Sequence, residues 1–182
     1  PDKGYELENL TATDGEGQEV ELDENHSFTM PASDVTVTAT FKAIDYTITV
    51  ADTKNGKATV NKETATINEE IEITTEPAEG YEVKSITVTD TEGKEATVEN
   101  NSFTMPASNV TVTVTFKAID YKITVAETTN GKVEADKTSA TAGTNVTLTV
   151  TPEKGYELEN LTVKDAEGQE VTVENNSFTM PA

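Results

Sequence analysis

Val-Thr-Val-Thr-Val-Thr-Phe-Lys, residues 110–117, alternates apolar and polar side chains without a break. Successive side chains of a β-strand point to opposite faces of the sheet, so the three valines and Phe116 share one face. Threonine on the other face favours a strand without exposing apolar surface. This stretch therefore predicts a strand with one buried face, in a protein built from β-sheets.

The sequence around this strand recurs along the chain. Phe-Lys-Ala-Ile-Asp-Tyr begins at Phe41 and again, 75 residues later, at Phe116. Gly-Tyr-Glu begins at Gly4, Gly80 and Gly155, at spacings of 76 and 75 residues. A fixed period of this length indicates tandem repeats. We divide the chain into the C-terminal half of one repeat (residues 1–44), a complete repeat (45–119) and a repeat lacking its last strand (120–182).

Turn-forming residues separate the alternating segments. In the complete repeat, Asn55-Gly56 follows the alternating residues 46–50, and this pair is typical of a type I′ hairpin turn. We expect a hairpin from 46–50 into 58–60. The extra residue of the first repeat lies between Val20 and Phe28, which indicates an exposed loop there.

Three smaller patterns refine this division into strands. Asn68 stands where the next repeat has Gly143, and both residue types tolerate a left-handed backbone, which predicts a tight turn. Leu7 and Leu10 differ in parity within one predicted strand, and the later copies keep this odd spacing, which predicts a β-bulge. Asp-x-Glu-Gly, as at Asp90, predicts a further turn in each copy.

Together these patterns give six or seven short strands per repeat and no segment of helical period. We predict an all-β fold of tandem small antiparallel β-sandwich domains, immunoglobulin-like, of about 75 residues each. A β-grasp-like sheet is the alternative.

The repeats resemble a known family of bacterial proteins. The residues that carry the resemblance are Asn-Gly-Lys-Val-x-Ala-Asp-Lys at 130–137, Val-Thr-Leu-Thr-Val-Thr-Pro at 146–152, and Phe-Thr-Met-Pro-Ala-Ser with the valine–threonine strand that follows it. They are similar to divergent internalin B-type B-repeats. That resemblance implies an extracellular protein, on the surface of a bacterium or secreted, in which repeats act as spacers or adhesive stalks. It supplies no catalytic or ligand residues.

The composition disfavours several classes of binding partner. Thirteen Lys and Arg against 34 Asp and Glu give a net charge of −21, which disfavours nucleic acid and anionic lipid as partners. Cysteine is absent, which excludes disulfides, thiolate metal ligands and cysteine nucleophiles. No apolar run is long enough to insert into a membrane.

No residue pattern indicates catalysis or a bound cofactor. His26 is the single histidine, and the other copies have Asn101 and Asn176 in its place. The acidic turns loosely resemble calcium loops but lack their ligand spacing, so we assign no catalytic, cofactor-binding or metal residue. Lys42 and Lys117 fall on the outward face of their strands, which argues against an internal cross-link to asparagine.

We therefore expect no enzyme activity and no cofactor, with calcium as the one ion considered. The leading hypothesis is a spacer or stalk repeat of a bacterial surface or secreted protein, whose partners are the neighbouring repeats of its own chain. The alternative is an adhesive module that binds a glycan or a host surface protein, with avidity from repetition. A sheet edge left open by an incomplete repeat would also allow end-to-end assembly of the chain.

Overall fold

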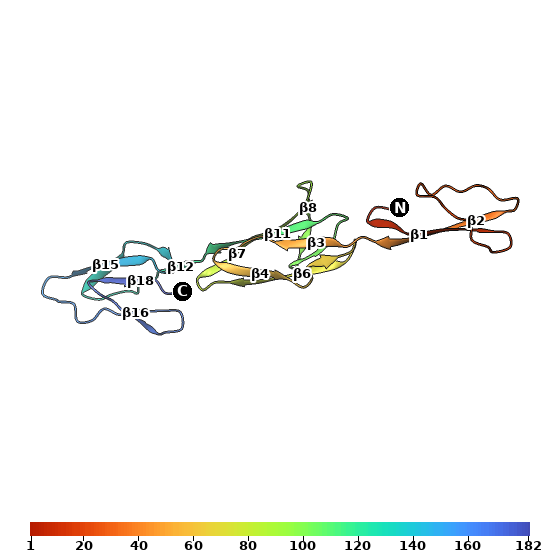
Figure 1. Cartoon of the computed structure of the whole chain (residues 1–182). Helices are drawn as coiled ribbons and strands as arrows, with labels where there is room; N and C mark the ends of the chain where they lie inside the picture. The colour runs from red at the N-terminus through yellow and green to blue at the C-terminus, as the bar shows by residue number, and fades with distance from the viewer. The chain divides into compact units, whose positions relative to one another are not determined.

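The computed structural model describes residues 1–182 and contains strands, turns and irregular segments, with no helix. The prediction of an all-β protein is confirmed. The strands are β1 (Tyr5–Asp14), β2 (Val35–Ala43), β3 (Tyr46–Val50), β4 (Gly56–Val60), β5 (Thr64–Ala65), β6 (Glu70–Pro77), β7 (Tyr81–Asp90), β8 (Glu95–Ala96), β9 (Val98–Glu99), β10 (Ser102–Thr104), β11 (Val110–Ala118), β12 (Asp120–Lys122), β13 (Gly131–Ala135), β14 (Ser139–Thr141), β15 (Asn145–Pro152), β16 (Val163–Lys164), β17 (Glu170–Val171) and β18 (Ser177–Thr179) (Figure 1). No helix is therefore available that could cross a membrane.

Contacts divide the chain into two compact units. The first holds residues 1–52, 58–74 and 86–114, and the second holds 53–57, 75–85 and 115–182. Each unit includes one junction between successive repeats: residues 43–46 lie in the first and residues 118–121 in the second.

The middle repeat contains two sheets. Their strand orders are β4-β6-β10-β9 and β5-β3-β11-β7-β8. Each sheet buries one apolar face, which is the arrangement of a β-sandwich, as predicted. The buried side chains are Ile48, Ala65, Ile71, Ile73, Val88, Phe103, Met105, Val110, Val112 and Val114.

Strand β11, the alternating stretch that indicated the fold, lies at the centre of the five-stranded sheet. Its alternate valines are buried, with Val112 fully inaccessible to solvent. The pairing of β11 with β3 is parallel, with Val110 opposite Ile48 and Val112 opposite Val50. The sheet is therefore mixed, where a purely antiparallel one was expected, because the chain passes through the other sheet before it returns beside β3.

The predicted Asn55-Gly56 hairpin is wrong. Strand β3 belongs to the five-stranded sheet and β4 to the four-stranded one, so the two do not pair. Asn55 alone takes a positive φ, of 65°. Gly56 is required for close packing, because a Cβ at this position would come within 2.7 Å of the Phe116 ring.

Two consecutive positive φ angles, the mark of a type I′ turn, occur instead at Asn100 (50°) and Asn101 (59°). This turn joins β9 to β10, in which Val98 pairs with Phe103. Asparagine tolerates the left-handed conformation at both positions. The sequence pair that forms the hairpin turn is therefore Asn100-Asn101 and not Asn55-Gly56.

The other turn predictions are confirmed. The Asp90 carboxylate accepts hydrogen bonds from the backbone amides of Glu92 and Lys94, at 2.9 and 2.8 Å. The turns that begin at Asp14 and Asp165 repeat this pattern. Asn68 and Gly143 adopt φ of 68° and 78°, as expected of a left-handed turn.

The predicted bulge is also present, as a register shift between Leu7 and Asn9 where β1 pairs with β2. The middle repeat has nine strands, where six or seven were predicted, and the additional ones include the two-residue strands β5, β8 and β9.

The flanking repeats retain parts of this architecture. In the first, β1 and β2 form a two-stranded sheet. In the third, β13-β15-β18 corresponds to β4-β6-β10, and β12-β14 corresponds to β3 with β5. The core of the third repeat consists of Ala140, Val146, Leu148 and Phe178.

Candidate interface between repeats

Successive repeats are joined with almost no intervening chain. Strand β2 ends at Ala43 and β3 begins at Tyr46. At the second junction β11 ends at Ala118 and β12 begins at Asp120. One strand therefore runs almost directly into the next, which restricts where the following repeat can lie.

The first junction is held by the turn that precedes β1. Gly4 adopts φ of 88° and is buried. Its carbonyl oxygen accepts a hydrogen bond of 2.9 Å from the amide of Ile44, in the connection to the next repeat. A Cβ at Gly4 would lie 2.8 Å from Cγ2 of Ile67, which belongs to the second repeat. The turn of one repeat is therefore packed directly against a side chain of the next.

The second junction repeats these contacts at the equivalent positions. Gly80 adopts φ of 79°, is buried, and accepts a 2.8 Å hydrogen bond from the amide of Ile119. A Cβ at Gly80 would lie 3.0 Å from Cβ of Ala142 and 3.6 Å from Cβ of Ala182, both in the third repeat. Ala142 occupies the position that Ile67 has one repeat earlier. The same pair of positions therefore meets at both junctions.

Gly155 shows what the turn requires without a neighbour. Its φ of 91° matches that of the other two glycines, but a Cβ there would meet nothing within 4 Å, and the residue is exposed. The left-handed backbone alone explains glycine in all three copies. Close approach of the next repeat is a second constraint, and it is observed at Gly4 and Gly80.

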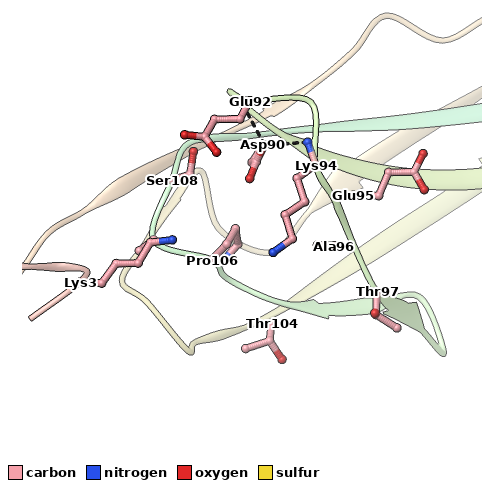
Figure 2. Close-up of a pocket in the computed structure, with 11 residues that line it drawn as sticks. Lys3, Asp90, Glu92, Lys94, Glu95, Ala96, Thr97, Thr104, Pro106 and Ser108 are labelled. Carbon is pink, nitrogen blue, oxygen red and sulfur yellow. Dashed lines mark hydrogen bonds between the residues drawn. The ribbon is translucent and has the colours of Figure 1, made fainter.

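A polar hollow of about 500 Å³ lies beside the first junction, inside the first compact unit (Figure 2). Its lining consists of Lys3 from the first repeat and, from the second, Asp90, Glu92, Lys94, Glu95, Ala96, Thr97, Thr104, Pro106, Ala107 and Ser108. Figure 2 shows the Lys94 side chain extending toward Pro106, while Asp90 caps its own turn. The lining has lysine, carboxylate and hydroxyl groups but no aromatic ring on which a sugar could stack.

The two lysines examined for an internal cross-link lie outward, as predicted. Lys42 forms an ion pair of 3.1 Å with Glu6, and Lys117 one of 2.9 Å with Glu82. All four side chains are about half exposed, so these cross-strand pairs contribute little to stability.

Two carboxyl groups at the surface have shifted pKa values. A hydrogen bond from Lys62, supported by one from Thr66, lowers the pKa of Glu69. A hydrogen bond from Lys137, together with one from a backbone amide, lowers the pKa of Asp136. Both groups are stabilised as anions, which makes neither of them a candidate general acid.

His26 closes a turn at the surface. The Asp23 carboxylate accepts hydrogen bonds from the amides of Asn25 and Ser27, in the pattern of the Asp90 turn. His26, with φ of 60°, takes the place that glycine has in that turn. The extra residue of the first repeat is therefore absorbed in this turn, where sequence reasoning predicted only a loop. No group of three His, Asp or Glu side chains is arranged to hold a metal ion.

The fold and the recurring interface define a tandem array of small all-β domains that meet through one repeated contact. The chain belongs to the divergent InlB B-repeat domain family, which matches residues 1–45, 46–120 and 121–182. The resemblance noted in the sequence is thus confirmed over the whole chain. None of the curated proteins compared with it matches.

Proposed function

We propose that the chain is a non-catalytic spacer of a bacterial surface or secreted protein, in which each repeat holds the next in a defined position. The observation that carries this proposal is the recurrence of one contact, Gly4 on Ile67 and Gly80 on Ala142, at two successive junctions. A flexible tether would need no such contact.

The chemistry of the junction suits this role. The connection contains no glycine or proline, and its amide donates to the glycine carbonyl of the preceding repeat. A neighbouring side chain within van der Waals contact of that glycine removes the space in which the turn could move. The net charge of −21 opposes close association with anionic surfaces and with other acidic chains.

The proposed location follows from the family, since repeats of this type extend surface proteins of bacteria. The role needs no active site, and the groups described above are accounted for by turns, caps and surface ion pairs. We accordingly propose that the chain has no enzymatic activity and needs no cofactor or calcium.

An adhesive role is the second candidate, and the polar hollow is the feature that favours it. Its hydroxyl and charged groups could form hydrogen bonds with a glycan or with a host protein. The missing aromatic ring and the open, solvated surface weaken it as a sugar site. Titration of the 182-residue chain on a glycan array would distinguish the adhesive role from the spacer role. Saturable binding that is lost in Lys94→Ala would favour adhesion.

The spacer role is tested by the distribution of distances across the second junction. Because the chain has no cysteine, Glu92→Cys and Glu167→Cys place two spin labels uniquely, one on each side of it. The labelled chain is diluted into excess unlabelled chain, so that only distances within one molecule are measured. We expect one narrow distribution, unchanged by calcium or by a chelator.

Matched variants show whether the contact at Gly80 is the cause of the narrow distance distribution. Gly80→Ala should broaden the distribution, whereas Gly155→Ala, which has the same backbone strain and no neighbour, should not. A broad distribution in the unmodified chain would overturn the spacer proposal. A distribution that narrows only with calcium would overturn its independence of metal.

A further inference from the structure

Strands β3 and β11 are the first and last strands of the middle repeat, and they are neighbours in one sheet (Figure 1). The chain enters β3 at Tyr46 and leaves β11 at Ala118. The two strands run parallel, with Val110 opposite Ile48. The point of entry and the point of exit therefore lie at opposite ends of one pair of strands.

Tension along the chain loads this pair in one particular direction. A pull on Tyr46 and an opposite pull on Ala118 draw the two strands past each other, along their own axes. The hydrogen bonds of a parallel pair run between the strands, so all of them share such a load and must break together. A pull at the same end of both strands would instead break them one after another. The topology therefore exposes the pair to the load that it resists best.

The junctions lead the load straight into these two strands. Between β2 and β3 lie only Ile44 and Asp45, and between β11 and β12 only Ile119. Such short connections have no slack to take up. Tension that is transmitted from repeat to repeat thus reaches β3 and β11 before any other strand of the middle repeat.

Two hydrogen bonds continue the pairing beyond the three residue pairs of the ladder. At one end, the amide of Ala51 donates to the carbonyl oxygen of Val112 at 2.9 Å. At the other end, the amide of Thr47 donates to Oδ1 of Asn109 at 2.8 Å. The Asn109 side chain thus supplies a bond at a position where the ladder has ended, and the load must break this bond as well.

The core-facing side of the pair is closed to water. The exposed fractions of Ile48, Val110 and Val112 are 4%, 3% and 0%. Hydrogen bonds beside such a dry face are not readily exchanged for bonds with water. Sliding of one strand along the other would also move these side chains out of their packed positions. Packing and hydrogen bonding therefore oppose the same motion.

We propose that β3 and β11 form a clamp that bears tension and gives the middle repeat high resistance to unfolding by a pull along the chain. The clamp consists of the three ladder pairs together with the bonds at Ala51 and Asn109. This inference deepens the proposed spacer role and rests on it for the source of the load. A surface spacer is stretched between its two attachments, which is the direction that the clamp resists.

The test is a single-molecule measurement of the force that unfolds the middle repeat within the 182-residue chain. Because the chain has no cysteine, pairs of engineered cysteines define the points of attachment. Asp45→Cys with Ala118→Cys pulls from opposite ends of the clamp, whereas Asp45→Cys with Ala107→Cys pulls from the same end. Both pairs lie within one repeat, so the neighbouring repeats carry no load. At one pulling speed, we expect the first geometry to need several times the force of the second.

Two kinds of variant separate the clamp from overall stability. Ala51→Pro and Asn109→Ala each remove one bond at an end of the clamp, and both should reduce the force in the first geometry. Ile71→Val removes a methyl group from a fully buried position in the other sheet. It should reduce stability in urea but change that force little, because forced unfolding is limited by the rate at which the clamp breaks. The amide spectrum of each variant checks that it is folded.

Equal forces in the two geometries would overturn the proposal. A loss of force in Ile71→Val as large as in the clamp variants would do the same, because the resistance would then follow overall stability. The spacer role is judged separately, by the distance distribution across the second junction. A narrow distribution with equal forces would reject the clamp alone, and a broad distribution with unequal forces would reject the spacer role alone.

Discussion

Phe-Thr-Met is found in both the first and the middle repeat, with opposite outcomes. Met105 of the middle repeat is 1% exposed, whereas the equivalent Met30 is 61% exposed. In the middle repeat this segment is β10, which pairs with β6. Residues 28–30 form no strand, and residues 1–44 contain no counterpart of β6 with which they could pair. Identical local sequence is thus ordered or left exposed according to its partner.

The segment that begins with Gly-Tyr-Glu also differs between repeats, but here the third repeat is the one that lacks the strand. It forms long strands in the first and middle repeats, as β1 and β7, where a valine–threonine strand lies beside it. In the third repeat the same segment forms no strand over residues 156–162. Residues 5–11 and 156–162 have the same sequence, so their strand propensity is the same, and pairing decides which of the two is a strand.

The largest effect should come from a charge on the buried face of the pairing strand. Val112→Asp places a carboxylate where the exposed fraction is 0%. We expect it to lower the free energy of unfolding of the middle repeat by more than about 4 kcal/mol. Urea titration followed by the amide signals of that repeat measures this. Val37→Asp, its counterpart in the first repeat, should change stability by less than about 0.5 kcal/mol; equal effects would contradict the comparison.

Truncation of the methionines should have the next largest effect. Met105→Ala should cost about 2–4 kcal/mol in the same urea titration, because it leaves a cavity in the sandwich. Met30→Ala should cost less than about 0.5 kcal/mol, because its side chain is mostly in water. A large cost at Met30 would mean that the first repeat is more tightly packed than described.

The junction glycines give a smaller, paired difference. Gly80→Ala and Gly155→Ala have the same backbone strain, but only the first also crowds Ala142. We expect Gly80→Ala to reduce stability by about 1 kcal/mol more than Gly155→Ala, as measured by thermal unfolding at fixed concentration. If the two changes have equal effects, the neighbour contributes nothing to the requirement for glycine.

The smallest expected effect is the change in melting temperature with pH that is caused by Glu69. The Lys62 hydrogen bond lowers the pKa of Glu69 below the ordinary 4.5, so its stabilisation is complete above pH 4.5 and is lost as the pH falls through the lowered pKa. Glu69→Gln should reduce the melting temperature slightly at pH 6, and the difference from the unmodified chain should shrink at pH 2. A difference that stays constant over this range would exclude the ion pair as its cause.

Much of the fold could be predicted from the sequence because it is determined by local pattern. Alternation placed β11 and its buried valines, parity predicted the bulge in β1, and Asp-x-Glu-Gly predicted turns capped by their own aspartate. These features depend on residues that are neighbours along the chain. The spacing of 75 residues predicted in the same way that the chain consists of tandem repeats, which the three family matches confirm.

Contacts between distant residues could not be predicted in this way. Gly56 was interpreted as half of a hairpin turn, but the Phe116 ring, 60 positions later, is what restricts it to glycine. The parallel pairing of β3 with β11 and the contact of Gly4 with Ile67 depend likewise on the folded arrangement. The turn at His26 could have been found, since Asp23 precedes it with the spacing of the other capped turns.

That turn has a consequence for how such an array changes over generations. The middle repeat joins β9 to β10 through the two residues Asn100 and Asn101, whereas the first repeat uses a longer turn closed by Asp23. Both versions lead into the same Phe-Thr-Met segment, and β2 keeps its alternation. A gene of tandem repeats, prone to slippage during copying, can thus gain or lose one codon here while every downstream strand keeps its inward and outward faces.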